Sequence, residues 1–356
     1  MDDEVLQVKN LSVSFGGNVQ AVSDVSFDLR QGECFALVGE SGCGKSTTAR
    51  AIMRLIKEPG KITGGEVLFG DDRSDLLKLN KNEMAHIRGK NIGMIFQNPL
   101  DSLNPVYTSG DQVAEGLIVD KVEKKKAWEI ADSVFHDVKI PDPEKRLKSY
   151  PHEISGGMRQ RVMIGMMLCR KPKILIADEP TTALDVTIQA SIIELMNDLR
   201  AQYNTAVMLI THDFGIVADM ADRVAVMYAG KIVEMGDVFD IFDRPQHPYT
   251  KLLMKALPTI KKSEGRLETI PGTVPDLSQE IKGCRFADRC PYCMDICREH
   301  APGMHEVEDG HCCACHLLDT SEGEQLAVSR SGFAADAADG QQNTAAAADT
   351  SEGGDL

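Results

Sequence analysis

The feature that most constrains this chain is a glycine-rich loop, Gly39-Glu40-Ser41-Gly42-Cys43-Gly44-Lys45-Ser46-Thr47, which fits the pattern G-x-x-x-x-G-K-[ST]. It follows a short apolar run, Cys34 to Val38, and precedes a predicted helix from Lys45 to about Ile56. In this arrangement backbone N–H groups can wrap around phosphate oxygens, and the helix N-terminus adds the positive end of its dipole. Lys45 can pair with the β- and γ-phosphates of a nucleotide, and the Ser46 hydroxyl can ligate Mg²⁺. The loop therefore predicts a nucleotide site built from Gly39, Ser41, Gly42, Cys43, Gly44, Lys45, Ser46 and Thr47.

A pair of acids fits the same chemistry. The apolar stretch that begins at Lys173 ends in Asp178 and Glu179, and adjacent buried carboxylates are unfavourable without a cation. We expect Asp178 to end a strand next to the strand that leads into the phosphate loop, and to hold Mg²⁺ through water. We expect Glu179 to polarise the attacking water. Alone the pair is a weak signal, because a strand end that reaches solvent can also carry two acids.

The order of the predicted elements indicates an α/β fold. Strands alternate with helices, which predicts a mostly parallel sheet covered on both faces. Two antiparallel strands precede it, joined by a turn at Gly16-Gly17, and a helical stretch at about 109–170 is added to it. The expected strands are Val5–Phe15, Val19–Leu29, Cys34–Val38, Ile92–Phe96, Ile174–Ala177 and Ala206–Thr211, and a further helix is expected over Thr187–Tyr203.

The segment Ile154-Ser155-Gly156-Gly157-Met158-Arg159-Gln160 resembles the signature of ABC ATPases, with Ile154 in the place of the usual Leu. Ser155 and the two glycines can begin a helix and present backbone N–H groups to an anion. The resemblance implies that this anion is the γ-phosphate held by the opposite subunit of a head-to-tail dimer. It assigns Ser155, Gly156, Gly157 and Gln160 to the nucleotide site.

Other elements of ABC ATPases follow in the family's order. Gln97 resembles the Q-loop glutamine, which implies an approach to Mg²⁺ and the attacking water, and His212 resembles the switch histidine that contacts the γ-phosphate. Asp185 resembles the last residue of the D-loop that crosses to the partner, and Phe15 lies where an aromatic ring usually stacks on adenine. The resemblance implies a P-loop ABC ATPase domain over residues 1–240, with an antiparallel β subdomain and a helical signature subdomain at about 100–170.

The segment after Gln97 carries a further implication of the family. In ABC ATPases it leads into the contact with the membrane subunit. We therefore expect residues from Asn98 to about Val106 to touch that subunit, and Leu103 to be a suitable crosslinking position.

The region after residue 240 resembles a narrower group. Arg244-Pro-Gln-His247-Pro248-Tyr249-Thr250, together with residues 270–276 and 283–291, resembles the C-terminal region of oligopeptide, dipeptide and nickel importer ATPases, and is closest to the D-type peptide-importer subunit. The resemblance implies an ATPase that powers peptide import with ATP and Mg²⁺, or the same role for nickel or another small solute. It also implies a second, related ATP-binding subunit, two transmembrane permease subunits, an external peptide-binding protein, and a peripheral location on the cytoplasmic face of a prokaryotic inner membrane.

Seven of the ten cysteines lie between Cys284 and Cys315. In a reducing cytoplasm such a cluster favours metal ligands over disulfides. The spacing of Cys284, Cys290, Cys297 and Cys315 resembles the pattern that binds a [4Fe–4S] cluster in some of these subunits. Cys293 with Cys290 and nearby histidines fits zinc as well, and unmetallated thiols are a third possibility. This cluster belongs to a C-terminal region expected over residues 241–318.

The charge of the chain excludes one class of function. The net charge is −15, and the tail from Asp319 holds eight acids and one base, or −7. A nucleic-acid binder would need a basic surface, which this balance does not predict. The tail, 319–356, has the composition of a disordered segment. We find no secretory signal and no apolar stretch of the length of a membrane span, so we expect the chain to reach a membrane through a partner.

Two other functions fit parts of the sequence. A soluble ABC mechanoenzyme usually has two cassettes in one chain or a long coiled coil, whereas this chain has one phosphate loop and no sustained heptads. A redox protein with an incidental ATPase is disfavoured by the complete set of ATPase elements.

Overall fold

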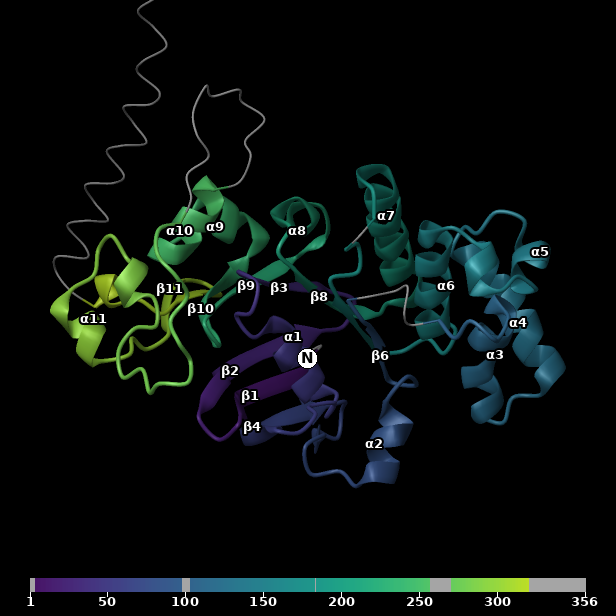
Figure 1. The fold of residues 1–356 in the computed structure, drawn as a ribbon, viewed down its shortest axis with the longest axis horizontal. Helices are drawn as coiled ribbons and strands as arrows, with labels where there is room; N and C mark the ends of the chain where they lie inside the picture. Colours follow the sequence, from purple (N-terminus) through teal and green to yellow (C-terminus); the bar gives the residue numbers. More distant parts are fainter. Residues whose placement is uncertain (1–3, 98–102, 183, 257–269, 320–356) are drawn as a thin grey trace, which may run out of the picture. The chain divides into compact units, whose positions relative to one another are not determined.

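A computed structural model describes residues 4–97, 103–182, 184–256 and 270–319 of the chain (Figure 1). The chain divides into two compact units, Met1–Ala314 and Cys315–Leu356. The larger unit contains two sheets. The predicted tail lies outside the described residues from position 320 onward.

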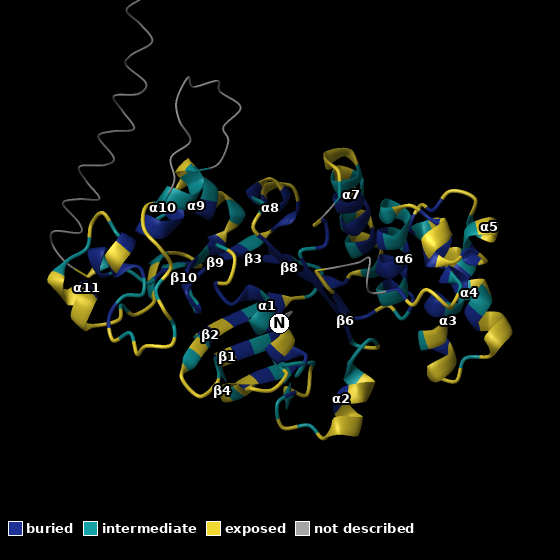
Figure 2. Cartoon of the chain, in the orientation of Figure 1, coloured by how far each residue is buried: buried dark blue, intermediate teal, exposed yellow. Residues whose placement is uncertain are grey.

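The main sheet has the strand order β11-β12-β10-β9-β3-β8-β7-β6. Its central strands run parallel and are apolar, and β3, β6, β7 and β8 are buried at every residue, as expected for strands covered on both faces (Figure 2). The strands from β10 onward pair antiparallel. The bounds are β3 Cys34–Val38, β6 Ile92–Ile95, β7 Ile174–Asp178, β8 Ala206–Thr211, β9 Arg223–Tyr228, β10 Lys231–Asp237, β11 His305–Glu308 and β12 His311–Cys313.

A second, antiparallel sheet has the order β2-β1-β4-β5. Gly16 and Gly17 both have positive φ, 58° and 85°, and form the turn between the first two strands, as predicted. Apolar side chains of this sheet pack with α1 and with one set of side chains from β3, β7 and β8 into a single core. The bounds are β1 Glu4–Phe15, β2 Val19–Arg30, β4 Gly60–Phe69 and β5 Ser74–Asp75.

Helices cover the other face of the main sheet and form a separate subdomain. A second core joins the sheet to α6, α7 and α8, and it includes the side chains of α3 and α4. Figure 1 shows α3, α4, α5 and α6 gathered together, away from α1. The bounds are α1 Lys45–Ile52, α2 Lys81–Ile87, α3 Ser109–Val119, α4 Lys124–Asp137, α5 Pro143–Leu147, α6 Gly156–Leu168, α7 Val186–Tyr203, α8 Phe214–Met220, α9 Val238–Asp243, α10 Pro248–Lys255 and α11 Asp295–Glu299.

Two expectations from the sequence were wrong in detail. The helix after the phosphate loop ends at Ile52, before Ile56, because Arg54 takes a left-handed φ of 50° that an α-helix cannot contain. The strand that carries Asp178 is not next to the phosphate-loop strand, because β8 lies between β3 and β7 and pairs with both. Within the described residues, none of the helices combines the length and apolar character that crossing a bilayer requires.

Candidate active site

The phosphate loop joins β3 to α1, and its glycines are required by its backbone. Gly39, Gly42 and Gly44 have φ values of 149°, 79° and 111°, a region that side-chain-bearing residues rarely adopt. A Cβ on Gly39 would lie 2.1 Å from the carbonyl oxygen of Met227, so strand β9 packs directly against the loop. Ser41 and Gly42 are exposed at the outside of the turn. The loop is therefore a closely held backbone cradle.

The charged residue of the loop is held by the loop itself. Lys45 is the first residue of α1 and is buried. Its Nζ donates hydrogen bonds to the carbonyl oxygens of Gly39, at 2.7 Å, and Glu40, at 3.0 Å. This places a fixed positive charge inside the cradle, where it can pair with phosphate. Cys43 is buried, and burial raises the pKa of its thiol, so its side chain belongs to the protein interior.

The predicted magnesium residues lie together. The Ser46 hydroxyl donates to Oδ1 of Asp178 at 2.7 Å, although β8 separates the two parent strands. Asp178 is fully buried, and burial raises the pKa of its carboxyl group against the opposing hydrogen bond from Ser46. Among the described residues, no hydrogen-bond donor reaches its Oδ2. A buried carboxylate oxygen with no donor fits a divalent cation, because oxygen ligands are what Mg²⁺ prefers.

Two of the three predicted catalytic residues, Gln97 and His212, contact the carboxylate of the third, Glu179. Gln97 Nε2 donates to Oε2 of Glu179 at 3.0 Å, and His212 Nδ1 lies 3.0 Å from Oε1. The Thr182 hydroxyl donates to Oε2 at 2.8 Å. Partial burial opposes ionisation of Glu179, but the bonds from Thr182, His212 and Gln97 outweigh it and hold the pKa of Glu179 below its usual range. Glu179 is therefore an ionised acceptor at neutral pH, suited to polarising a water molecule.

Sequence reasoning missed Thr182 as a partner of Glu179. The sequence around Thr182 gives no indication of a bond to the acid three positions earlier. Glu179 itself has a left-handed φ of 50°. That turn at the strand end brings the Thr182 hydroxyl back onto the carboxylate.

The signature segment begins a helix, as predicted. Ser155 is the N-cap of α6, and its hydroxyl accepts a hydrogen bond from the Met158 N–H at 3.3 Å. A Cβ on Gly156 would meet nothing within 4 Å, whereas one on Gly157 would press on Ile188 of α7 at 2.9 Å. The helix start is thus open on one side and closely packed on the other.

Gln160, which the resemblance assigns to the nucleotide site, has a different environment from Ser155 and Gly156. Its side chain is fully buried and donates to the carbonyl oxygen of Pro180, directly after Glu179. Gln160 ties the signature helix α6 to the segment that follows the catalytic strand.

The two remaining predicted residues lie at element ends. Asp185 is the N-cap of α7 and accepts from the Ile188 N–H at 3.0 Å. Phe15 ends β1 and lines a pocket of about 540 Å³ with Thr47 of the phosphate-loop helix and Phe96. The pocket therefore brings the predicted adenine-stacking ring beside the predicted phosphate site.

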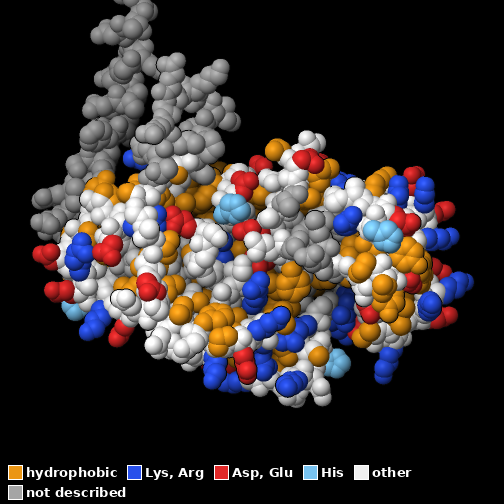
Figure 3. Space-filling view, viewed as in Figure 1, with side chains coloured by type: hydrophobic (Ala, Val, Ile, Leu, Met, Phe, Trp, Pro, Cys, Tyr) orange, Lys and Arg blue, Asp and Glu red, His pale blue; other side chains and the backbone are white. Residues whose placement is uncertain are grey.

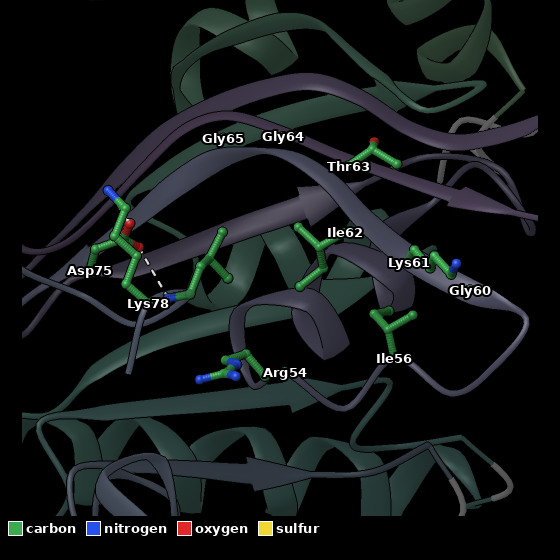
Figure 4. A pocket seen from close by; sticks show the side chains of 11 residues that line it. Arg54, Ile56, Gly60, Lys61, Ile62, Thr63, Gly64, Gly65, Asp75 and Lys78 are labelled. Carbon is green, nitrogen blue, oxygen red and sulfur yellow. Dashed lines mark hydrogen bonds and ion pairs between the residues drawn. The ribbon is translucent and has the colours of Figure 1, made fainter. Parts of the chain in front are cut away.

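A second pocket lies on the antiparallel sheet. It has a volume of about 640 Å³, and Figure 4 shows Arg54, Lys61 and Lys78 around it, with Lys78 paired to Asp75 at 3.0 Å. Lys and Arg side chains gather over this part of the molecule in Figure 3. Its lining includes none of the residues predicted to bind nucleotide, so we do not assign the nucleotide to it.

The segment after Gln97 is described from residue 103 onward, and 98–102 lie outside the described residues. Leu103 is buried in the core, so its prediction as a crosslinking position was wrong. Val106 and Tyr107 are exposed, with 70% and 56% of their surface accessible. Both side chains offer apolar surface to a partner in the part of the segment that the structure describes.

The predicted metal site of the C-terminal region is not supported. Four cysteines lie near enough to influence one another, namely Cys284, Cys290, Cys293 and Cys297. Cys315, predicted as the fourth ligand, begins the second compact unit. Among the described residues, no three His, Cys, Asp or Glu side chains are arranged to hold a metal ion. Burial raises the pKa of the Cys290 thiol to about 11.

A buried carboxylate organises the C-terminal region, and the sequence did not predict it. Glu234 of β10 accepts hydrogen bonds from the backbone N–H groups of Gln246 and His247, and its Oε1 lies 2.9 Å from Nε2 of His311. The His247 ring then accepts from the Tyr249 N–H at 3.0 Å and caps α10. The segment 244–250 is therefore bound to the main sheet by polar bonds.

Aromatic packing adds to this attachment. Tyr249 packs with Tyr228 of β9 and with Phe286, at ring-centroid distances of 4.6 and 5.4 Å. All three rings are fully buried. The C-terminal region thus shares the core of the main sheet.

Known proteins resemble this chain along most of its length. Residues 22–182 match the family model described as ABC transporter, and residues 233–297 match the one described as oligopeptide/dipeptide transporter, C-terminal region. The dipeptide transport ATP-binding protein DppD of Bacillus subtilis is 52% identical over 89% of this chain and 96% of its own length. The oligopeptide transport ATP-binding protein OppD of Escherichia coli is 47% identical over 88% of this chain and 93% of its own.

Solved structures resemble the fold. The chain matches cbiO1 from Clostridium perfringens, part of an ABC transporter complex, with a TM-score of 0.61 and 26% identity over 68% of this chain and 92% of that one. It matches a dimeric ATP-binding cassette bound to ADP and Pi with a TM-score of 0.58 and 27% identity, over 65% of this chain and 98% of that one. The predicted ATPase fold is confirmed.

Proposed function

Because this chain belongs to the family of ABC transporter ATP-binding subunits with the oligopeptide/dipeptide C-terminal region, we propose that it powers the import of di- or oligopeptides across a membrane. It is an ATPase coupled to transport, as the sequence predicted. The observation that carries the proposal is the convergence of Gln97, Thr182 and His212 on Glu179 beside the phosphate loop.

Hydrolysis needs an aligned water and a stabilised γ-phosphate. The Glu179 carboxylate can accept a hydrogen bond from the attacking water. Gln97 and His212 each contact one carboxylate oxygen and so fix the orientation of the group. Lys45 pairs with the β- and γ-phosphates, and the backbone N–H groups of the loop donate hydrogen bonds to the phosphate oxygens. Ser46 and Asp178 would hold Mg²⁺, which neutralises charge on the phosphates when bound.

A second ATP-binding subunit would complete each site. Ser155 and the open side of Gly156 begin α6, which lies apart from α1 of the same chain (Figure 1). The signature of one subunit is therefore available to the nucleotide of another, and we propose a related but different chain as the partner. A tagged chain isolated from membranes should bring down one related ATPase.

The membrane partners are proposed to be two permease subunits, met through the exposed side chains of Val106 and Tyr107. This would hold the chain on the cytoplasmic face of the membrane, with an external peptide-binding protein delivering cargo. A cysteine at Tyr107 should crosslink to a permease, while one at Lys61, on the antiparallel sheet, should not. Crosslinks from position 107 that reach only another ATPase subunit would contradict the proposed contact with the permease.

The cargo is tested by uptake. Vesicles that carry the co-purified complex, with ATP inside and the binding protein outside, should accumulate a labelled dipeptide or short oligopeptide supplied from outside. Accumulation of nickel in place of peptide would favour the alternative solute. A chain that co-purifies with no membrane protein would favour a soluble ABC mechanoenzyme. For the chain itself we propose an ATPase domain over 1–240 and a C-terminal region over 241–318.

The [4Fe–4S] assignment to Cys284, Cys290, Cys297 and Cys315 is proposed on the spacing alone. The side-chain arrangement of the described residues does not form the site, and no step of the reaction depends on it. Anaerobically purified protein with about four irons per chain and broad absorption near roughly 400 nm would support it. One zinc per chain would indicate a zinc site. Protein that is folded and active without metal would show that these cysteines are ordinary thiols.

A further inference from the structure

We propose that Arg289 is a positioning residue for ATP binding, which neutralises Glu40 of the phosphate loop and thereby keeps an uncompensated negative charge away from the triphosphate. The proposal rests on the ATP-binding function above. It assigns to the C-terminal region a direct effect on nucleotide affinity.

The contact joins two distant parts of the chain. Nη1 of Arg289 lies 2.8 Å from Oε2 of Glu40, and Nη2 lies 3.0 Å from Oε1, a bidentate ion pair. Glu40 directly follows Gly39 in the phosphate loop, and its own carbonyl oxygen accepts from Nζ of Lys45 at 3.0 Å. The carboxylate bound by Arg289 thus belongs to the residue whose backbone holds the phosphate-binding lysine.

Arg289 is itself fixed from several sides. Its side chain is 5% exposed. Nε donates to the carbonyl oxygen of Pro271 at 2.9 Å, and the guanidinium lies over the ring of Tyr228, 5.7 Å from its centroid. A guanidinium is always protonated in proteins, so the residue stays charged. An arginine held this way has little freedom to seek another partner.

A second bond from the same region holds the backbone of Glu40. The Glu40 N–H donates to the hydroxyl of Tyr249 at 3.0 Å. Tyr249 and Arg289 both follow residue 240, so the C-terminal region binds this position of the loop by backbone and side chain together.

The electrostatic consequence is specific. ATP brings several negative charges to the loop, and a free Glu40 carboxylate would repel them at a partly buried position where water screens poorly. Arg289 cancels that repulsion. Loss of Arg289 should therefore weaken nucleotide binding through Glu40, and removal of the Glu40 charge should restore binding even with Arg289 absent. A residue that serves only to support the fold would not be rescued in this way.

The test measures the dissociation constant of a non-hydrolysable ATP analogue with Mg²⁺ for the full chain at low salt. Arg289→Ala should raise it by about tenfold, and the effect should shrink as salt is added. Arg289→Ala with Glu40→Gln should return to within about twofold of Glu40→Gln alone. In the assembled transporter, Arg289→Ala should raise KM for ATP far more than it lowers kcat.

Arg170 supplies the matched control, because it forms a similar bidentate pair with Asp120 in the helical subdomain, at 2.8 and 2.7 Å. Arg170→Ala should leave nucleotide affinity unchanged. Where Arg289→Ala does not fold, Arg289→Gln makes the same comparison with less loss of packing. Native affinity in a folded Arg289 variant, or a double variant as weak as the single one, would overturn the proposal. If even the native chain binds no analogue and Lys45→Ala changes nothing, the failure lies in the ATP-binding function instead.

Discussion

Nδ1 of His212 lies 3.0 Å from Oε1 of Glu179, at the ends of strands β8 and β7. The two residues are 33 positions apart in the sequence, and the parallel pairing of their strands brings them to the same edge of the sheet. The contact makes His212 part of the environment that keeps Glu179 ionised.

Loss of His212 should change both the rate and the pH profile. His212→Ala should lower ATP hydrolysis by about a hundredfold, with nucleotide binding retained. Because the bond from His212 helps to lower the pKa of Glu179, its removal should raise that pKa and move the acid limb of the pH–rate profile to higher pH. Steady-state ATPase rates across the pH range test this. His86→Ala, at an exposed position of α2, should match the native profile, and an unmoved acid limb in His212→Ala would contradict the assignment.

Loss of Lys45 should affect binding before chemistry. Lys45→Ala removes the buried cation from the cradle and should weaken binding of an ATP analogue by about a hundredfold. Lys61→Ala is the control, because Lys61 is exposed in the pocket on the antiparallel sheet. Equilibrium titration of both variants distinguishes the two pockets. A larger loss in the Lys61 variant would mean that the nucleotide binds to the antiparallel sheet.

Loss of Glu234 should destabilise the larger unit. Glu234→Ala removes three hydrogen bonds to a fully buried carboxylate and leaves their donors without an acceptor, at a cost of about 3 kcal/mol in the free energy of unfolding. Chemical denaturation gives the measurement. Glu66→Ala, which breaks an exposed pair with Lys78, should leave stability unchanged. Equal midpoints for the native chain and Glu234→Ala would show that the buried carboxylate contributes nothing.

The burial of His247 should make stability depend on pH. Burial lowers the pKa of His247 to about 4, against the opposing effect of Glu234. In the unfolded chain the ring gains a proton near pH 6.5, so the stability that neutral His247 contributes is complete above that pH and is lost as the pH falls toward about 4.

His247→Asn tests this dependence. Asparagine can still cap α10 but does not titrate. The variant should lose less stability than the native chain between about pH 6.5 and 4, when unfolding midpoints are measured by denaturation at each pH. Parallel curves for the two proteins would rule out His247 as the titrating group.

Local patterns predicted the nucleotide elements well, because each is a short segment with its own backbone requirement. The strand ending at Val38, the glycines of the loop and the start of α1 at Lys45 all lie where the pattern indicated. Strand order was predicted less well. Nothing in the apolar run before Asp178 indicates that β8 lies between this strand and the phosphate-loop strand β3.

Long-range polar contacts were beyond reach of the sequence. Arg289 and Glu40 are 249 positions apart, and no sequence pattern predicts that they are in contact. Gln160 stands within the signature, yet its amide faces the interior because α6 packs against the segment after Glu179. Motif membership predicts where a residue lies along the chain, whereas the direction of its side chain depends on packing.

The central claim is that Glu179 drives hydrolysis that powers peptide uptake, and the most direct measurement is uptake by vesicles containing the complete transporter with the substitution Glu179→Gln. The account predicts that this variant binds ATP normally and accumulates as a closed, nucleotide-bound dimer. It should neither hydrolyse ATP nor accumulate labelled peptide, while Glu129→Gln on the exposed face of α4 does both at the native rate. Native rates of hydrolysis and uptake in the Glu179→Gln transporter would contradict the account.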